Sequence, residues 1–331
     1  MTHVSRLRSI APLLAAAVIA AGCRTRAAPE RLVVAFEPQP ALGLLFLARD
    51  GGCAAHAGLE IEARPTASGR EALGLLLSGE ADAAVAYETP VVLRASAAPD
   101  LRLLTTLHVS SRNTVAIGRR DRGVQRADDL RGRTVAVPLR TNAEFLLEML
   151  LAANGISRDD VNVVDVAPDQ APAVLAAGRV DAIAISSPYA DLAAQALPEG
   201  TAVELRSGIY TETSLLATRA STLAARRPAL AKLVRCLAAE EDRATTEPAR
   251  TARIVAAAVP GIPPDLVAAA LARVTFQVGL SSALVTQLDQ EAEWLRAAGA
   301  LAGRPVDYRR LLAPALVAAA APESVTIPLG P

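Results

Sequence analysis

The sequence predicts an α/β fold of two doubly wound lobes around a central cleft, followed by a helical C-terminal segment. The first observation is a repeated phrase: "LLSGEADAAVA" (76–86) and "LAAGRVDAIAI" (175–185) share Gly-x-x-Asp-Ala, with Asp181 lying 99 residues after Asp82. The second is that the same order of strand, helix, strand and helix precedes each phrase. The third is composition, because only 3% of the residues are aromatic, which favours helices packed on parallel strands. Each phrase therefore completes the core unit of one lobe.

The elements of each lobe follow from short apolar runs, which predict strands, and from glycines, which commonly end helices. In the first lobe we expect strands at 31–38 and 59–65 and a helix at 41–52. In the second lobe we expect strands at 133–140 and 161–168 and a helix at 143–155. A short helix and the repeated phrase, which ends in an apolar strand, follow in each lobe.

Two further strands, at 113–120 and 214–220, are expected where the chain crosses between the lobes. Hinges would lie near Arg119–Asp121 and Gly208–Thr213. From residue 217 the chain reads as mostly helical, and Pro263-Pro264 opens one helix, as proline can in a first turn. The expected organisation is lobe I at 31–118 plus 213–320, lobe II at 122–208 and a tail at 321–331.

The N-terminal segment predicts export. Arg6 and Arg8 precede an uncharged run at 10–21, as in a secretory signal at 1–22, and the run is shorter than the roughly 20 residues of a membrane-spanning helix. "AAGC" resembles the bacterial lipobox, except that Ala20 stands where that pattern usually has leucine. Cys23, the first residue of an expected linker at 23–31, is thus either lipidated or follows an ordinary cleaved signal. Either way we expect a protein of the periplasm or of the outer face of the cell membrane, with a lipid anchor as the favoured alternative.

Charge, cysteine and histidine usage exclude several functions. The chain has 34 basic and 34 acidic residues, so no clustered positive charge indicates a nucleic-acid partner. Cys53 and Cys236 are left either to pair as a disulfide in an oxidising compartment or to stay as buried free thiols. His56 and His108 have no ligand-like neighbours at the usual spacings, so we expect no metal. No phosphate loop, nucleophile elbow or dinucleotide motif follows a strand, so we expect no catalytic residue and no cofactor.

The strand ends predict where a ligand would lie. Ligands of open parallel sheets bind outside the carboxyl ends of the strands, where helices begin. The segments that open helices there are 68–71, 89–90, 141–144 and 186–189. Ser68 with Glu71, and Thr141 with Glu144, match the S/T-x-x-E capping box, so their hydroxyls are either helix caps or ligand contacts. Helix N-termini that meet in one cleft also form a site for anions or polar groups.

Three segments together resemble a known family. "SGREALGLLLSGEADAAVAYETP", "LRGRTVAVPLRTNAEFLLEMLLAANGI" and "LAAGRVDAIAISSPYADLA" resemble the periplasmic substrate-binding proteins of ABC importers, in the branch for nitrate, alkanesulfonates, taurine and the thiamine-precursor pyrimidine. The resemblance covers about 32–315. It implies a type II periplasmic-binding fold, a monomer that closes on a small solute by hinge motion, and docking onto a membrane permease with its ATPase.

The resemblance also implies a set of pocket residues at the strand ends. They are Phe36, Glu37, Ser68, Tyr87, Glu88, Thr89, Arg140, Thr141, Asn142, Ser186 and Tyr189. This chain departs from the family pattern at Tyr87-Glu88 and at Ser186-Ser187. Glu37 and Glu88 would place two carboxylates near the cleft, which disfavours a sulfonate unless Arg140 offsets one of them. We therefore expect a ligand with donor groups, such as an aminopyrimidine.

Two other classes of function stay open. One is an enzyme of the same fold that acts on a pyrimidine or an aromatic acid, although such pathways are cytosolic and this chain begins with an export signal. The other is a ligand-sensing module that serves a signalling partner.

Overall fold

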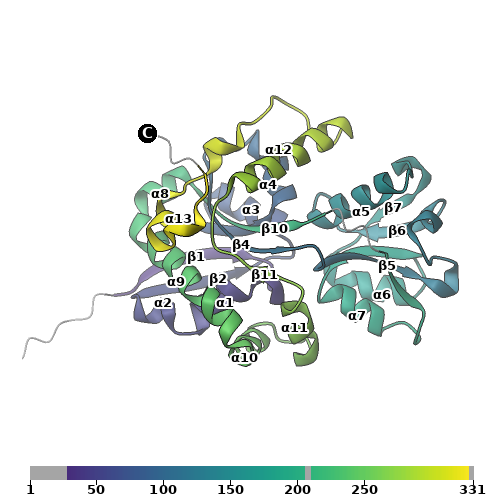
Figure 1. The fold of residues 1–331 in the computed structure, drawn as a ribbon, viewed down its shortest axis with the longest axis horizontal. Helices are drawn as coiled ribbons and strands as arrows, with labels where there is room; N and C mark the ends of the chain where they lie inside the picture. Colours follow the sequence, from purple (N-terminus) through teal and green to yellow (C-terminus); the bar gives the residue numbers. More distant parts are fainter. Residues whose placement is uncertain (1–27, 206–209, 328–331) are drawn as a thin grey trace, which may run out of the picture.

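The computed structural model describes residues 28–205 and 210–327. The expected signal at 1–22, Cys23 and part of the second hinge lie outside these residues. Figure 1 shows two lobes, each a sheet covered by helices, which confirms the predicted two-lobed α/β fold. Within the described ranges, no helix is both long and apolar enough to cross a membrane.

The first lobe contains a six-stranded sheet in the order β11-β4-β10-β3-β1-β2. β1 pairs in parallel with β2 and β3, whereas β10 runs antiparallel to both β3 and β4, and β11 runs antiparallel to β4. The strands are β1 (Glu30–Phe36), β2 (Leu59–Pro65), β3 (Ala83–Tyr87), β4 (Leu101–Ser110), β10 (Glu212–Arg219) and β11 (Thr275–Phe276).

The second lobe contains a five-stranded sheet in the order β7-β6-β8-β5-β9. β6 pairs in parallel with β7 and β8, and β5 runs antiparallel to β8 and β9. The strands are β5 (Thr114–Arg119), β6 (Thr134–Val137), β7 (Asn162–Asp165), β8 (Ala182–Ser186) and β9 (Ala202–Leu205).

Both sheets are mixed, which differs from the expectation of purely parallel sheets. The parallel strands are those joined by helices. The antiparallel strands include the four that flank the crossings between lobes, because β4 leads directly into β5 and β9 leads towards β10. β5 belongs to the second sheet, so the first crossing lies at 111–113, before the predicted hinge at Arg119–Asp121 and the predicted lobe boundary at 118.

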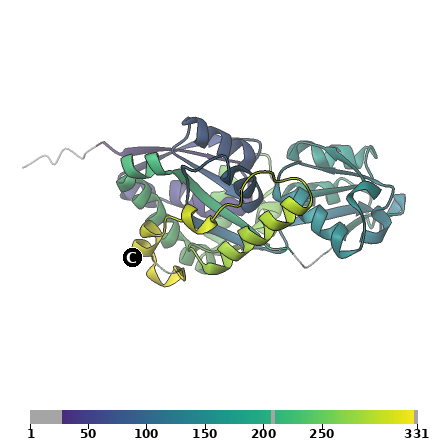
Figure 2. The ribbon, with the colours of Figure 1, turned by 90° about the horizontal axis from the view of Figure 1, so that it is seen from above.

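The helices complete the two lobes. Those after β10 pack on the first sheet, so the first lobe is the larger one, as the green and yellow segments of Figures 1 and 2 show. They are α1 (Gly43–Asp50), α2 (Cys53–His56), α3 (Gly69–Ser78), α4 (Glu88–Ala95), α5 (Asn142–Ala153), α6 (Ala171–Ala176), α7 (Tyr189–Gln195), α8 (Ala220–Ala225), α9 (Arg227–Thr246), α10 (Pro248–Ala258), α11 (Pro264–Leu271), α12 (Ser282–Ala297) and α13 (Ala315–Ala320).

The repeated phrase performs the same structural task in each lobe. Gly79 and Gly178 follow α3 and α6 with φ of 90° and 67°, a left-handed conformation that glycine adopts without steric cost. Asp82 then accepts a hydrogen bond from the backbone N–H of Val33 at 2.9 Å, and Asp181 accepts one from that of Thr134 at 3.0 Å. Each aspartate thus fastens the start of one strand to its parallel neighbour.

A disulfide links two distant parts of the first lobe. Cys53 at the start of α2 is bonded to Cys236 in α9. Of the two alternatives that the sequence left open, the structure has the paired one.

Candidate functional site

A cleft lies between the lobes at the carboxyl ends of β1, β3, β6 and β8. The two walls lie close together, and the cleft has a cavity volume of about 30 Å³. The described residues that line it include no lysine, arginine, histidine or cysteine. They are Glu37, Ser68, Gly69, Tyr87, Pro90, Pro138, Thr141, Asn142, Ala143, Pro168, Ile185, Ser186 and Tyr189.

The structure brings most of the predicted site residues together. Seven of them line the cleft, namely Glu37, Ser68, Tyr87, Thr141, Asn142, Ser186 and Tyr189. Phe36 does not, because its ring is buried and packs edge-on against Phe46. Thr89 and Arg140 line a neighbouring groove beside Trp294 instead, so Arg140 places no cation on the cleft wall.

Helix caps explain why Ser68 and Thr141 stand at the cleft. Ser68 Oγ accepts a hydrogen bond from the N–H of Glu71 at 3.3 Å, and Thr141 Oγ1 accepts one from that of Ala143 at 3.2 Å. The two acidic partners bond to the residue before each cap, since Glu71 accepts from Ala67 N and Glu144 accepts from Arg140 N. Both hydroxyls therefore accept a hydrogen bond from their own helix, and both residues also line the cleft.

Glu37 provides the carboxyl group of the cleft. It follows β1 and is one of the lining residues. Burial, with a smaller contribution from the negative charge of Asp169, raises its pKa to about 8. At neutral pH the cleft thus holds a mostly protonated carboxyl, and a donor or cation on a ligand would favour its ionised form.

Glu88 does not face the cleft, which corrects the expectation of two carboxylates there. As the first residue of α4 it turns back towards β10, where it accepts hydrogen bonds from the Tyr210 hydroxyl and from Thr213 N at 2.8 Å. Its side chain is completely buried. Burial raises its pKa to about 8, against the opposing effect of these hydrogen bonds.

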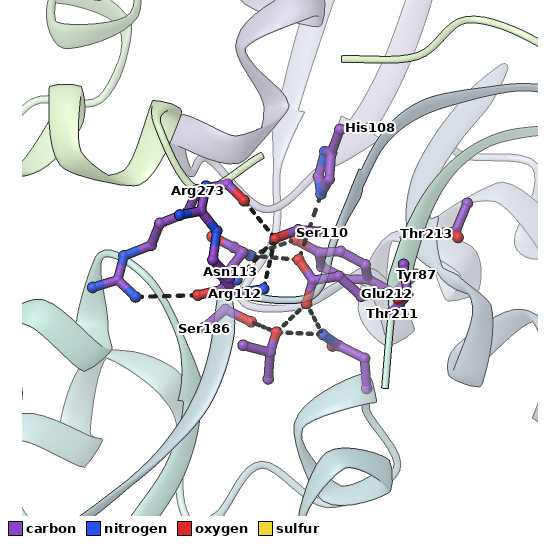
Figure 3. Close-up of polar contacts among 12 residues, drawn as sticks. Tyr87, His108, Ser110, Arg112, Asn113, Ser186, Thr211, Glu212, Thr213 and Arg273 are labelled. Atoms are coloured by element: carbon purple, nitrogen blue, oxygen red, sulfur yellow. Dashed lines mark hydrogen bonds and ion pairs between the residues drawn. The ribbon is translucent and has the colours of Figure 1, made fainter. Parts of the chain in front are cut away.

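A polar network that the sequence did not predict lies beneath the cleft, around Glu212 (Figure 3). Glu212 begins β10 and is 0% exposed. Its Oε1 accepts from Asn113 Nδ2 at 2.7 Å, and its Oε2 accepts from the Thr114 hydroxyl and from Asn142 Nδ2 at 3.2 Å. Glu212 lies two residues before the predicted strand at 214–220, and no pattern in the sequence assigned it to the site.

The network joins both lobes at the crossings. Asn113 lies between β4 and β5, and its Nδ2 is 3.4 Å from the hydroxyl of Tyr87 in the first lobe. Thr114 Oγ1 lies 2.7 Å from Ser186 Oγ and accepts from Asn142 Nδ2 at 2.9 Å in the second lobe. Residues on the cleft wall are therefore hydrogen-bonded to residues where the chain crosses between the lobes.

Further contacts bridge the lobes away from this network. Arg273, after α11 of the first lobe, donates from its Nη2 to Asp191 Oδ1 of α7 at 2.7 Å. Arg70 Nη1 donates to the carbonyl oxygen of Leu139 at 3.2 Å. The ring of Phe145 in α5 packs edge-on against Trp294 of α12, with centroids 5.1 Å apart. The two lobes are therefore in direct contact on several sides of the cleft.

Comparison with models of known protein families identifies the family to which the chain belongs. The model of the family described as "NMT1/THI5 like" matches residues 39–251, which is more than half of the chain. The chain belongs to the NMT1/THI5-like family. A comparison with curated protein sequences gave no significant match.

Solved structures place this NMT1/THI5-like protein in the periplasmic-binding-protein fold. The alkanesulfonate-binding protein SsuA from Xanthomonas axonopodis pv. citri, bound to MOPS, has a TM-score of 0.74 at 22% identity, covering 87% of this chain and 99% of that one. SsuA from Escherichia coli has a TM-score of 0.71 at 18% identity, covering 85% and 97%. The desulfurization enzyme DSZB has a TM-score of 0.65 at 19% identity, covering 88% and 99%. The resemblance that the sequence indicated is thus confirmed for family and fold.

Proposed function

We propose that the protein is the solute-binding component of an ABC importer, which holds a small polar solute between its lobes and presents it to a membrane permease. The observation that carries this proposal is the cleft itself, whose walls come from two lobes joined at two crossings. Fold relatives that bind sulfonates support it. A solute that contacts both walls favours the closed arrangement in proportion to its extra affinity for that arrangement.

The setting of this function follows from the N-terminal sequence. The basic and apolar start supports export to the periplasm or to the outer face of the cell membrane, with Cys23 as the point of lipid attachment. The protein would act there as a monomer that meets a permease and its ATPase.

A second candidate is an enzyme of the same fold, because DSZB is among the structural relatives. Against it, the described cleft lining has no histidine or cysteine, the side chains that most often serve as general base or nucleophile. Turnover of a bound aromatic acid or pyrimidine by the purified protein would favour this candidate.

A thermal-shift panel tests the importer proposal. It contains nitrate, taurine, longer alkanesulfonates, bicarbonate, aminopyrimidines and aromatic acids. A solute at a hundred times its Kd stabilises the folded state by about 2.7 kcal/mol, which raises Tm visibly.

Asn142→Ala, on the cleft wall, should abolish that rise in Tm. Asn162→Ala is the matched control, because Asn162 is exposed on β7, away from the cleft lining. A rise that survives Asn142→Ala would mean that the solute binds elsewhere, and the cleft would lose its proposed role.

A further inference from the structure

The buried carboxyl of Glu212 fixes the direction of every hydrogen bond around it. Both of its oxygens receive donors, from Asn113 on one side and from Thr114 and Asn142 on the other. A carboxylate accepts hydrogen bonds and has none to give. The groups that meet Glu212 must therefore turn their N–H and O–H bonds inward, away from the cleft.

Asn142 is oriented by this requirement. The two ends of an amide look alike in shape, so the surrounding network decides which end points where. Here the NH2 end must face Glu212 and Thr114, at 3.2 and 2.9 Å. The carbonyl oxygen is then left for the cleft, and none of the described residues donates a hydrogen bond to it.

Ser186 is oriented through Thr114. The single hydroxyl proton of Thr114 goes to Glu212, so its oxygen can only accept from its other neighbours. Ser186 Oγ, 2.7 Å away, must then be the donor of that pair. Its proton is directed inward and its lone pairs remain at the cleft.

Thr141 completes the pattern on this wall. Its hydroxyl donates to the carbonyl oxygen of Pro138 at 2.7 Å while accepting from Ala143 N. Of the four polar side chains that the second lobe contributes to the cleft lining, Thr141 and Ser186 therefore have their hydroxyl protons engaged within the protein, and Asn142 directs one N–H at Glu212 and Thr114, which lie too close together to take both amide protons. The fourth, Tyr189, has a hydroxyl that can still donate.

We infer that Glu212 is a specificity-determining residue, which makes the second-lobe wall of the cleft an array of hydrogen-bond acceptors and so selects a ligand that offers N–H or O–H donors there. This inference rests on the proposed function. Glu212 acts as a positioning residue, because it contacts no ligand itself and works through Asn142, Thr114 and Ser186. The absence of lysine, arginine and histidine from the described lining fits the same ligand class.

Glu212→Gln tests the inference with little change of shape. The glutamine amide supplies an NH2 group where only acceptors stood, so Asn142 can turn its own NH2 group to the cleft. The probes are guanidinium, benzamidine and 4-aminopyrimidine as donors, and nitrate and methanesulfonate as acceptors, with Kd measured by calorimetry. Wild type should prefer the donor probes. The variant should bind them about tenfold more weakly, as expected for one lost hydrogen bond, and shift its preference towards the anions.

Two further variants distinguish an effect of hydrogen-bond direction from a general structural effect of the substitution. Thr114→Val removes the hydroxyl that receives Ser186 and Asn142, and should weaken donor binding as Glu212→Gln does. Thr114→Ser keeps that hydroxyl and should retain the wild-type preference. Glu291→Gln is the matched control, since it changes another buried glutamate, in α12 and outside the cleft lining.

Each outcome decides between the inference and the proposed function. If anions bind wild type more tightly than donors, at a site that Asn142→Ala removes, the inference is wrong and the binding function stands. If Glu212→Gln keeps the wild-type preference while folded by circular dichroism, Glu212 does not set the specificity. If no probe binds wild type or any variant, the cleft is not the proposed solute site and both fail.

Discussion

The two lobes contain the same phrase, and its aspartate makes the same contacts in both. Asp82 and Asp181 each accept a backbone hydrogen bond from the neighbouring strand, at 2.9 and 3.0 Å, and each donates its own N–H to the same residue at 2.8 Å. Each also has an arginine 3.8 Å from its other oxygen, Arg226 in the first lobe and Arg122 in the second.

The lobes differ where the strand after the phrase reaches the cleft. The first lobe ends β3 at Tyr87 and continues with Glu88, whereas the second ends β8 at Ser186 and continues with Ser187. Glu88 accepts hydrogen bonds from Tyr210 in the second crossing and from Thr213 of β10, while Ser186 joins the network beneath the cleft. The glycine and aspartate at the start of each strand are thus repeated, whereas the residues at the strand ends differ between the lobes and make different contacts.

The largest expected difference between the lobes concerns the disulfide, which is found only in the first. Replacing Cys53 and Cys236 by serine should lower the free energy of unfolding by about 2–5 kcal/mol, since the bond constrains a long loop of the unfolded chain. Hydrogen exchange should locate the loss in β1, β2 and α9. An equal loss of protection in β6 and β8 would show that the lobes unfold as one unit.

The next prediction is that the two repeated aspartates contribute equally to the free energy of unfolding. Asp82→Ala and Asp181→Ala each remove the acceptor of a strand N–H, so each should cost about 1–3 kcal/mol in chemical denaturation. Asp128→Ala, at a half-buried position whose partner Arg126 is exposed, is the control and should change stability little. Costs that differ severalfold between the two lobes would contradict the equivalence.

The third effect is a pH dependence that involves Glu88 of the first lobe. Glu88 has a pKa of about 8 when folded, against an ordinary value of 4.5, so the folded protein holds this proton more tightly. The stability that it contributes is fully present below about pH 4.5 and is lost as pH rises through about 8. Tm should therefore decline gradually from pH 5 to 8.

Glu88→Gln should flatten that decline, and Ser187→Ala at the equivalent position of the second lobe should leave it unchanged. Glu37 adds a slope of the same sign, because its pKa is also raised to about 8. The variant should therefore reduce the slope without abolishing it. A slope that Glu88→Gln does not alter would place the titrating group elsewhere.

Much of the fold was predictable because its determinants are local. The repeated phrase, the glycines after α3 and α6 and the apolar strands can all be recognised in short windows, and they led to two lobes of the correct class. β4 and β9 were missed, since no helix separates either from the strand that follows across the lobe boundary.

The site was predictable only in part. Residues next to strand ends, such as Ser68 and Asn142, were expected at the cleft because topology places them there. The direction of a side chain depends on partners far along the chain, however. Glu88 turns to Tyr210, and Glu212 meets Thr114, 98 residues earlier. No local pattern contains either pairing.

The disulfide has one more consequence, which concerns connectivity rather than stability. Cys53 and Cys236 bracket the whole second lobe and both crossings, so their bond closes a covalent ring that contains one entire wall of the cleft. A single cut by a protease anywhere inside that ring opens it without releasing a fragment. Both walls would then remain on one molecule until a thiol reductant separates them.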